Sequence, residues 1–247
     1  MIIELALLGV GVGTLSGFFG IGGGTILVPA LLFIGYDIKA AVVISVVQMV
    51  FSSVFGSYLN SRRGTLDVRM VATIGAGGFV GAQASPYIVA GLDAIVLEGI
   101  FLGFVLFALV RLYMKLPEAA EARTVHPALL FAIGTGIGIF SISIGVGGSI
   151  LLVPILAGFL HIPLKQAISA GLFFVVFSSI SGLIGFTLSG QVDLADGLVV
   201  GIASMAGVAA GIGLKHRSSD RLQKRLIVVF YLLIALYLTY RLVTQHG

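Results

Sequence analysis

Two glycine-rich segments contain the residues of this sequence that are best suited to bind a ligand. GIGGG occupies 20–24 and GVGGS occupies 145–149, and both lie inside long apolar stretches. Glycine is a poor helix former, so each segment predicts a break in a helix. A helix that restarts inside a membrane begins with N–H groups that have no intrahelical acceptor and carry partial positive charge. Such a helix end favours an anion, so we expect a small anionic substrate here.

Serine and glutamine side chains extend this predicted anion site. Matching VFSS segments place serine pairs at 52–53 and 178–179, where hydroxyls could donate to an oxyanion. The alternative is a hydrogen bond from each serine to a carbonyl of its own helix. Gln48 would add amide donors, and its repeat mate is Phe174, so the two half-sites would be unequal. The candidate substrate-binding residues are Gly22, Gly23, Gly24, Thr25, Gln48, Ser52, Ser53, Gly147, Gly148, Ser149, Ser178 and Ser179.

Close helix packing is the other common use of glycine in membrane proteins. We assign the pairs Gly77/Gly81 and Gly207/Gly211 to packing. The clusters at 22–24 and 147–149 are assigned to the site, because a proline and a short apolar piece follow each of them. Pro29 and Pro154 are expected at the first helical position, where a missing N–H costs nothing.

The composition indicates that these segments lie in a lipid bilayer. Hydrophobic residues make up 58% of the 247 residues and charged residues only 10%, with a mean hydropathy of +1.17. Soluble domains carry about 25% charged residues. We therefore predict an all-α polytopic protein of the cytoplasmic (inner) membrane, since the alternation of a β-barrel is absent. There is no cysteine, and the four histidines are not spaced as ligand pairs, so we expect no metal, no cofactor, no enzyme activity and no nucleic-acid partner.

An internal duplication divides the chain into two transmembrane repeats. GIGGGTILVP at 20–29 recurs as GVGGSILLVP at 145–154, and GTLD at 64–67 recurs as GQVD at 190–193. The predicted units are residues 1–114 and 127–247, joined by a cytoplasmic linker at 115–126. Each repeat would contain a Gly-broken hairpin of short helices and three full transmembrane helices. The apolar pieces are 2–19, 25–35, 39–60, 69–91 and 94–114, then 127–144, 149–160, 165–188, 196–214 and 221–243.

The charges of two matching loops predict that the repeats have opposite orientations. Loop 61–69 carries Arg62, Arg63 and Arg69, whereas loop 189–196 carries no Lys or Arg and two Asp. The positive-inside rule places the first loop in the cytoplasm and the second outside. Equivalent loops on opposite sides define an inverted-topology repeat, and this scheme puts both termini outside. Glu98, Asp93, His161, Asp67 and Asp193 are candidates for proton coupling, with an interfacial position as the alternative for Glu98 and a loop as the alternative for His161 and the Asp pair.

The segments GFFGIGGGTILVP, SIGVGGSILLVP and VFSS resemble those of the TauE/SafE sulfite-exporter family of membrane permeases. The resemblance covers nearly the whole chain, and Ser149 departs from it where the first half has a third glycine. It implies transport of a small sulfur-containing anion such as sulfite, sulfoacetate or another organosulfonate, by export or by uptake. Inverted repeats with broken helices are typical of secondary transporters that work by alternating access. The alternative function is a passive anion channel that uses the same helix ends.

Overall fold

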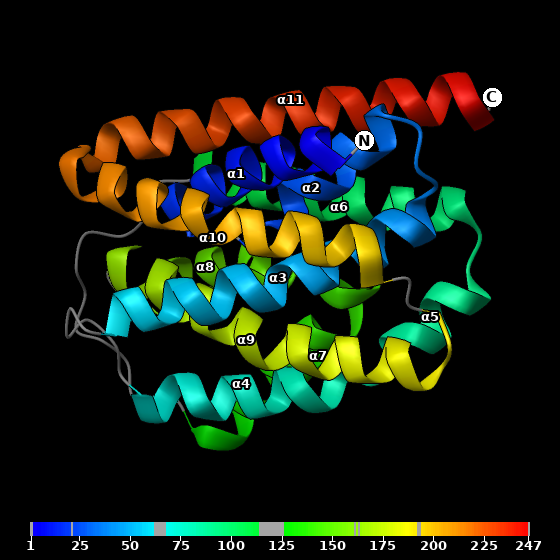
Figure 1. The fold of residues 1–247 in the computed structure, drawn as a ribbon. Helices are drawn as coiled ribbons and strands as arrows, with labels where there is room; N and C mark the ends of the chain where they lie inside the picture. Colours follow the sequence, from blue (N-terminus) through cyan, green and yellow to red (C-terminus); the bar gives the residue numbers. More distant parts are fainter. Residues whose placement is uncertain are drawn as a thin grey trace.

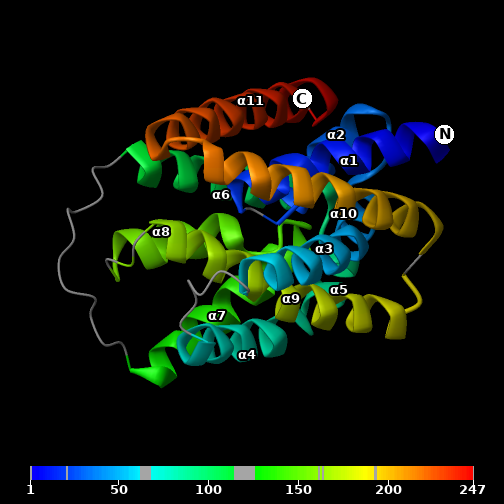
Figure 2. The same cartoon turned by 60° about the vertical axis from the view of Figure 1, so that its left-hand side comes forward.

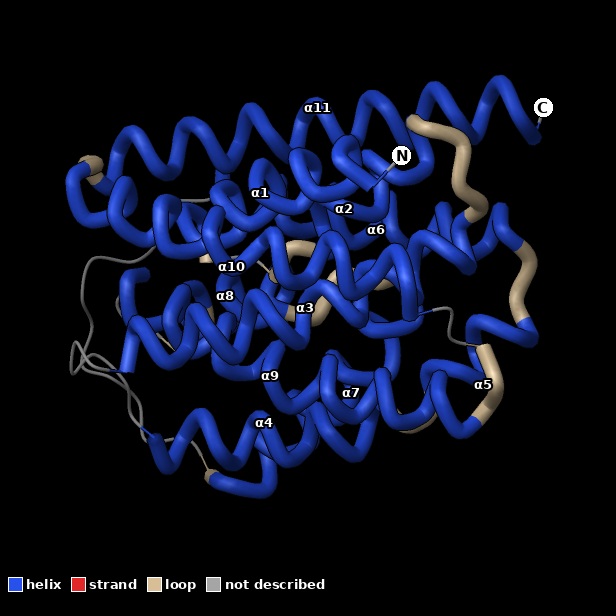
Figure 3. The backbone as a smooth tube through the Cα atoms, in the orientation of Figure 1, coloured by secondary structure: helices blue, strands red, loops and turns tan. Residues whose placement is uncertain are grey.

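The described residues of the computed structural model fold into helices and connecting loops (Figure 1). The structure describes residues 2–20, 22–61, 68–113, 126–160, 162, 164–191 and 194–246. Figure 3 shows helix as the one regular element in this part of the chain, which confirms the all-α prediction. The helices are α1 (Ile2–Phe19), α2 (Gly24–Phe33), α3 (Ile38–Ser61), α4 (Val68–Ala82), α5 (Ser85–Gly91), α6 (Ala94–Tyr113), α7 (Pro127–Ser143), α8 (Ser149–Gly158), α9 (Leu164–Leu188), α10 (Leu194–Arg217) and α11 (Asp220–His246).

Five of these helices are long and apolar enough to cross a membrane. The candidate spans are Ile2–Phe19, Ile38–Ser61, Gln166–Leu188, Leu194–Lys215 and Arg221–Thr244. Large apolar side chains cover the outside of the bundle, as Phe33, Leu188 and Leu236 illustrate with exposed fractions of 78%, 81% and 67%. Such a surface is stable in lipid and unstable in water, so the chain is a multi-pass membrane protein.

The segment 69–91, predicted as one full transmembrane helix, is instead split into α4 and α5. Pro86 lies in the first turn of α5. A proline has no N–H to donate, and its ring clashes with the carbonyl four residues earlier, here that of Ala82, the last residue of α4. The matching residue of the second half is Ile212, and α10 runs unbroken through it. One proline therefore makes this segment differ between the two halves.

The predicted position of Pro29 and Pro154 at the start of a helix is wrong. Both prolines lie inside their helices, as the sixth residue of α2 and of α8. The helices begin earlier, at Gly24 and Ser149, the last residues of the two glycine-rich segments. Each proline therefore deprives the carbonyl four residues before it of an intrahelical donor, at Thr25 in α2 and at Ile150 in α8.

Helix pairs from opposite halves pack against each other at glycine positions. α1 packs along α10 and α7 packs along α4 (Figures 1 and 2). A Cβ at Gly207 would lie within 3.0 Å of the Val10 carbonyl oxygen, and a Cβ at Gly77 would lie within 3.0 Å of the Phe131 carbonyl oxygen. The pairs Gly77/Gly81 and Gly207/Gly211 all meet backbone of the partner helix in this way, which confirms their assignment to packing.

Helices α3 and α9 form the centre of the bundle. They pack on each other, α10 covers α3, and α4 covers α9. Their membrane-spanning windows are 67% buried, whereas those of α1 and α10 are 44% buried. The short helices α2 and α8 lie against α3 and α9 respectively, and α6 packs with α11. The centre of the protein is thus built from α3, α9 and the two short helices.

Candidate functional site

The first helix break lies between α1 and α2. Gly20, the residue after α1, has φ at 65°, a left-handed conformation that glycine adopts without strain, and its N–H donates to the Ser16 carbonyl at 2.8 Å. Helix α2 then begins at Gly24, and no side chain caps its first turn. The first turn of α2 therefore lies inside the bundle, where the N–H groups of Thr25 and Ile26 donate to the Gly22 and Gly23 carbonyls at 3.3 and 3.1 Å.

The second break, between α7 and α8, contains three glycines with positive φ. Gly145, Gly147 and Gly148 have φ values of 70°, 77° and 87°. Residues with a Cβ rarely adopt these angles, which explains why glycine occupies the positions. Helix α8 begins at Ser149, again without a side-chain cap. Both halves therefore present the amino end of a ten-residue helix in the interior.

The two breaks touch each other. The Gly22 N–H donates to Oγ of Ser149 at 2.7 Å, across 127 residues of sequence, and the bond is buried. A Cβ at Gly24 would overlap the carbonyl oxygen of Gly145. The glycine at 24 is therefore required for the contact between the two segments.

The central helices contribute one side chain each to the junction of the breaks. Met49 of α3 and Val175 of α9 both lie beside Gly22 and beside Gly147. At Gly22 the position of a Cβ would be 3.1 Å from a Val175 methyl group and 3.3 Å from the Met49 sulfur. Met49 and Val175 are repeat mates that the sequence does not single out, because apolar residues in so apolar a chain carry no distinguishing signal.

Gln48 is a buried polar side chain that faces the first break. A Cβ at Gly23 would lie within 3.0 Å of the amide group of Gln48. The side chain is 0% exposed, and neither Oε1 nor Nε2 has a hydrogen-bond partner among the described residues. An unpartnered buried amide costs free energy, so its position next to an uncapped helix end points to a ligand. Its repeat mate Phe174 takes the same place beside Gly148.

The four serines of the VFSS segments differ in whether their hydroxyls contact a break or a carbonyl of their own helix. Ser178 donates to the Gly147 carbonyl at 3.2 Å, so it contacts the second break, and it also reaches the Phe174 carbonyl of its own helix at 3.2 Å. Ser52 and Ser179 donate back along their helices, to Met49 at 3.4 Å and to Val176 at 3.5 Å. The hydroxyls of Ser53 and Thr25 are buried and have no partner among the described residues.

Most of the ionisable candidates lie outside the described residues. His161, Asp67, Asp193 and the orientation residues Arg62 and Arg63 are outside them. Glu98, a candidate for proton coupling with an interfacial position as the alternative, has a fully buried side chain that accepts from Arg241 Nε at 3.0 Å. Arg241 Nη1 also donates to the Leu32 carbonyl at 3.0 Å, near the end of α2. The sequence does not predict this ion pair, because its partners are 143 residues apart. Within the described ranges, no group of three or more His, Asp or Glu could hold a metal.

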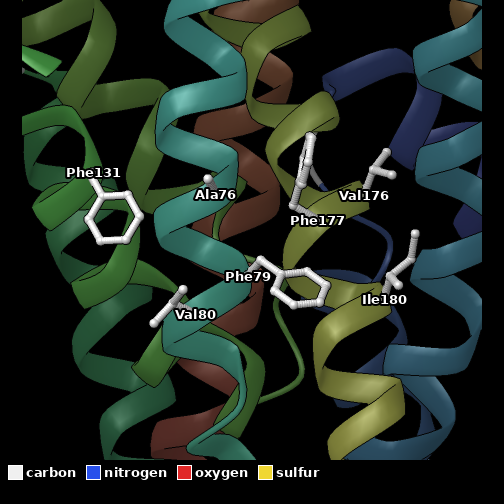
Figure 4. Close-up of a pocket in the computed structure, with 7 residues that line it drawn as sticks. All are labelled: Ala76, Phe79, Val80, Phe131, Val176, Phe177 and Ile180. Atoms are coloured by element: carbon white, nitrogen blue, oxygen red, sulfur yellow. The ribbon is translucent and has the colours of Figure 1, made fainter.

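A groove on the bundle surface has the wrong chemistry for an anion. Its lining residues are all apolar and come from α4, α7 and α9 (Figure 4): Ala76, Phe79, Val80, Phe131, Val176, Phe177 and Ile180. A second apolar groove between α3 and α10 is lined by Val50, Phe51, Val54, Phe55, Tyr58 and Met205. Both grooves suit hydrocarbon chains, so the polar atoms at the breaks remain the better candidate site for a charged ligand.

A multi-pass helical membrane protein with two uncapped helix ends in its interior has the architecture of a small-solute transporter. A family model described as "Sulfite exporter TauE/SafE" matches residues 5–238, so the chain belongs to the TauE/SafE family and is a membrane transporter. The resemblance noted in the sequence is therefore confirmed.

Curated relatives are similar over most of their length. A probable membrane transporter protein of Bacillus subtilis (strain 168), YdhB, is 24% identical over 218 residues, which cover 85% of this chain and 87% of the relative. Another, MJ0441 of Methanocaldococcus jannaschii, is 27% identical over 241 residues, covering 88% and 87%. YunE of Bacillus subtilis is 24% identical over 270 residues, covering 96% and 97%. No solved structure matches the chain.

Proposed function

We propose that this transporter carries a small sulfur-containing anion, such as sulfite, sulfoacetate or another organosulfonate, by alternating access. The observation that carries the proposal is the buried, unpartnered amide of Gln48 beside the uncapped start of α2, at the point where the two breaks meet. Helix N–H groups and a neutral amide attract an oxyanion without a fixed positive charge. Such a site releases its ligand readily, as a transporter requires.

The proposed mechanism needs two halves with opposite orientation, residues 1–114 and 127–247, joined by the linker 115–126. The reciprocal packing supports this arrangement: α1 contacts α10 as α7 contacts α4, and α3 contacts α10 as α9 contacts α4. The first helix of each half thus packs against the fourth apolar segment of the other half. Rocking of one half against the other about the junction of the breaks would expose the site to each side in turn.

Flux measurements in proteoliposomes test this function. The purified protein should transport labelled sulfite or sulfonate, and Gly23→Leu should abolish flux, because the leucine would occupy the space of the Gln48 amide. Gly11→Leu is the matched control, since the space beside Gly11 is open. Absence of flux for every anion in the wild type, or unchanged flux in Gly23→Leu, would overturn the proposal. Trans-stimulation by unlabelled anion distinguishes the carrier from the alternative, a passive channel.

A further inference from the structure

The first half of the chain contains most of the buried polar side-chain atoms that lack a hydrogen-bond partner among the described residues. Besides both amide atoms of Gln48, they include the hydroxyls of Thr25, Ser53 and Ser57. Each of these side chains is at most 5% exposed. Burial of an unpaired polar group is unfavourable, so each of these atoms needs a compensating partner.

The matching positions of the second half are mostly apolar. Ile150 corresponds to Thr25, Phe174 to Gln48 and Leu183 to Ser57, by the offsets of 125 and 126 that relate the repeats. The fourth mate, Ser179, keeps its hydroxyl but donates it to the Val176 carbonyl at 3.5 Å. The duplication has therefore kept the backbone of the two half-sites while their side chains differ in polarity.

The two half-sites, which differ at these positions, adjoin each other, and the second also carries the hydroxyls of Ser149 and Ser178. The Gln48 amide lies at Gly23 on one side, and the Phe174 ring and the Ile137 side chain lie at Gly148 on the other. One polar atom without a described partner, Oγ of Ser141, also lies near Gly148. The Gly22–Ser149 hydrogen bond joins the two sides, so a single small molecule could contact both.

We propose that the transported ligand is an amphiphilic monoanion, with a charged head at the first break and a short hydrocarbon tail at the second. This inference rests on the proposed function. The head would contact Gln48, Thr25 and the start of α2, and the tail would pack against Phe174 and Ile137. Short-chain alkanesulfonates have this chemistry. Sulfite and sulfate have no tail, and sulfoacetate would place a second charge against an apolar wall at a cost in affinity.

A chain-length series in the unmodified protein tests the inference. Competition against labelled ethanesulfonate in proteoliposomes should strengthen from methanesulfonate to ethanesulfonate to propanesulfonate. Each added CH₂ should improve the competition about fourfold, the factor that burial of one methylene provides. Sulfoacetate, sulfite and sulfate should compete more weakly than ethanesulfonate. A flat series, or sulfoacetate competing as well as ethanesulfonate, would overturn the inference.

Substitutions at the repeat mates Gln48 and Phe174 test which side chain produces the dependence on chain length. Phe174→Gln should remove the dependence on chain length, whereas Phe174→Leu, which keeps an apolar wall, should retain it. Gln48→Met should weaken competition by every anion equally and leave the chain-length dependence intact. An unchanged series in a folded Phe174→Gln protein would contradict the assignment. If sulfite is transported and the wild-type series is flat, only this inference fails; if no anion is transported, the proposed function fails as well.

Discussion

The Gly22 N–H donates a 2.7 Å hydrogen bond to Oγ of Ser149, and this buried bond links the break of the first half to the break of the second. Ser149 stands where the first half has Gly24, so the bond has no counterpart in the reverse direction. The Ser149 hydroxyl oxygen thus accepts a hydrogen bond from one of the N–H groups that would bind a substrate oxyanion under the proposed function. An empty carrier stabilised in this way would exchange the Ser149 contact for a ligand contact upon binding.

Ser149→Ala should lower the thermal stability of the ligand-free protein. The substitution leaves the buried Gly22 N–H without its acceptor, which costs about 1–3 kcal/mol. A bound anion can replace the acceptor, so stabilisation by a saturating organosulfonate should be larger in the variant than in the wild type. Thermal unfolding in detergent, with and without ligand, measures both effects. The control is Ser61→Ala, whose exposed hydroxyl donates to its own helix; equal behaviour of the two variants would contradict the role of Ser149.

Gly77→Ala should destabilise the bundle because the added methyl group meets backbone of α7, which has little freedom to move. Overpacking of this kind costs about 1–3 kcal/mol. Gly103→Ala on α6 is the matched control, since nothing lies within 4 Å of its Cβ position. Unfolding temperatures of the two purified variants decide the point. A loss of stability in Gly103→Ala equal to that in Gly77→Ala would show that close approach is not the cause.

The sequence predicted these packing glycines and both helix breaks, because glycine clusters and prolines act locally on the backbone. It could not predict which elements meet. Every helix here is apolar on most of its surface, so periodicity does not mark the face that contacts a neighbour. The Gly22–Ser149 bond, the positions of Met49 and Val175, and the pairing of Glu98 with Arg241 all depend on contacts between distant segments. Pro86 is a local signal for the break between α4 and α5. The length of the segment 69–91 favoured a single transmembrane helix and obscured that signal.

Arg241→Met should destabilise the protein strongly, because it removes the Arg241 side of the pair with the buried Glu98 carboxylate and the donor to the Leu32 carbonyl. Breaking one side of a buried pair costs about 3–5 kcal/mol. The double variant Glu98→Gln/Arg241→Met should recover part of this loss, since the buried carboxylate charge is removed as well. A double-mutant cycle on unfolding free energies measures the coupling. Additive effects of the two single substitutions would contradict a direct interaction.

Single-cysteine labelling tests the inverted arrangement of the halves. The chain has no native cysteine, so Ser61→Cys and Ser189→Cys each provide one reactive site. These exposed residues lie at the end of α3 and just beyond its repeat mate α9. A membrane-impermeant maleimide should label Ser189→Cys in intact cells and Ser61→Cys only after permeabilisation. Labelling of both residues from the same side would exclude the inverted topology.

The position of a bound anion tests the central claim most directly. Crystals of the protein grown with 2-bromoethanesulfonate would show the bromine in an anomalous difference map and the sulfonate in the accompanying electron density. We expect the sulfonate at the junction of the two breaks, between Gly22–Thr25 and Gly147–Ser149 and within hydrogen-bond distance of Gln48. A ligand bound elsewhere, with the junction still closed by the Gly22–Ser149 hydrogen bond, would contradict the account.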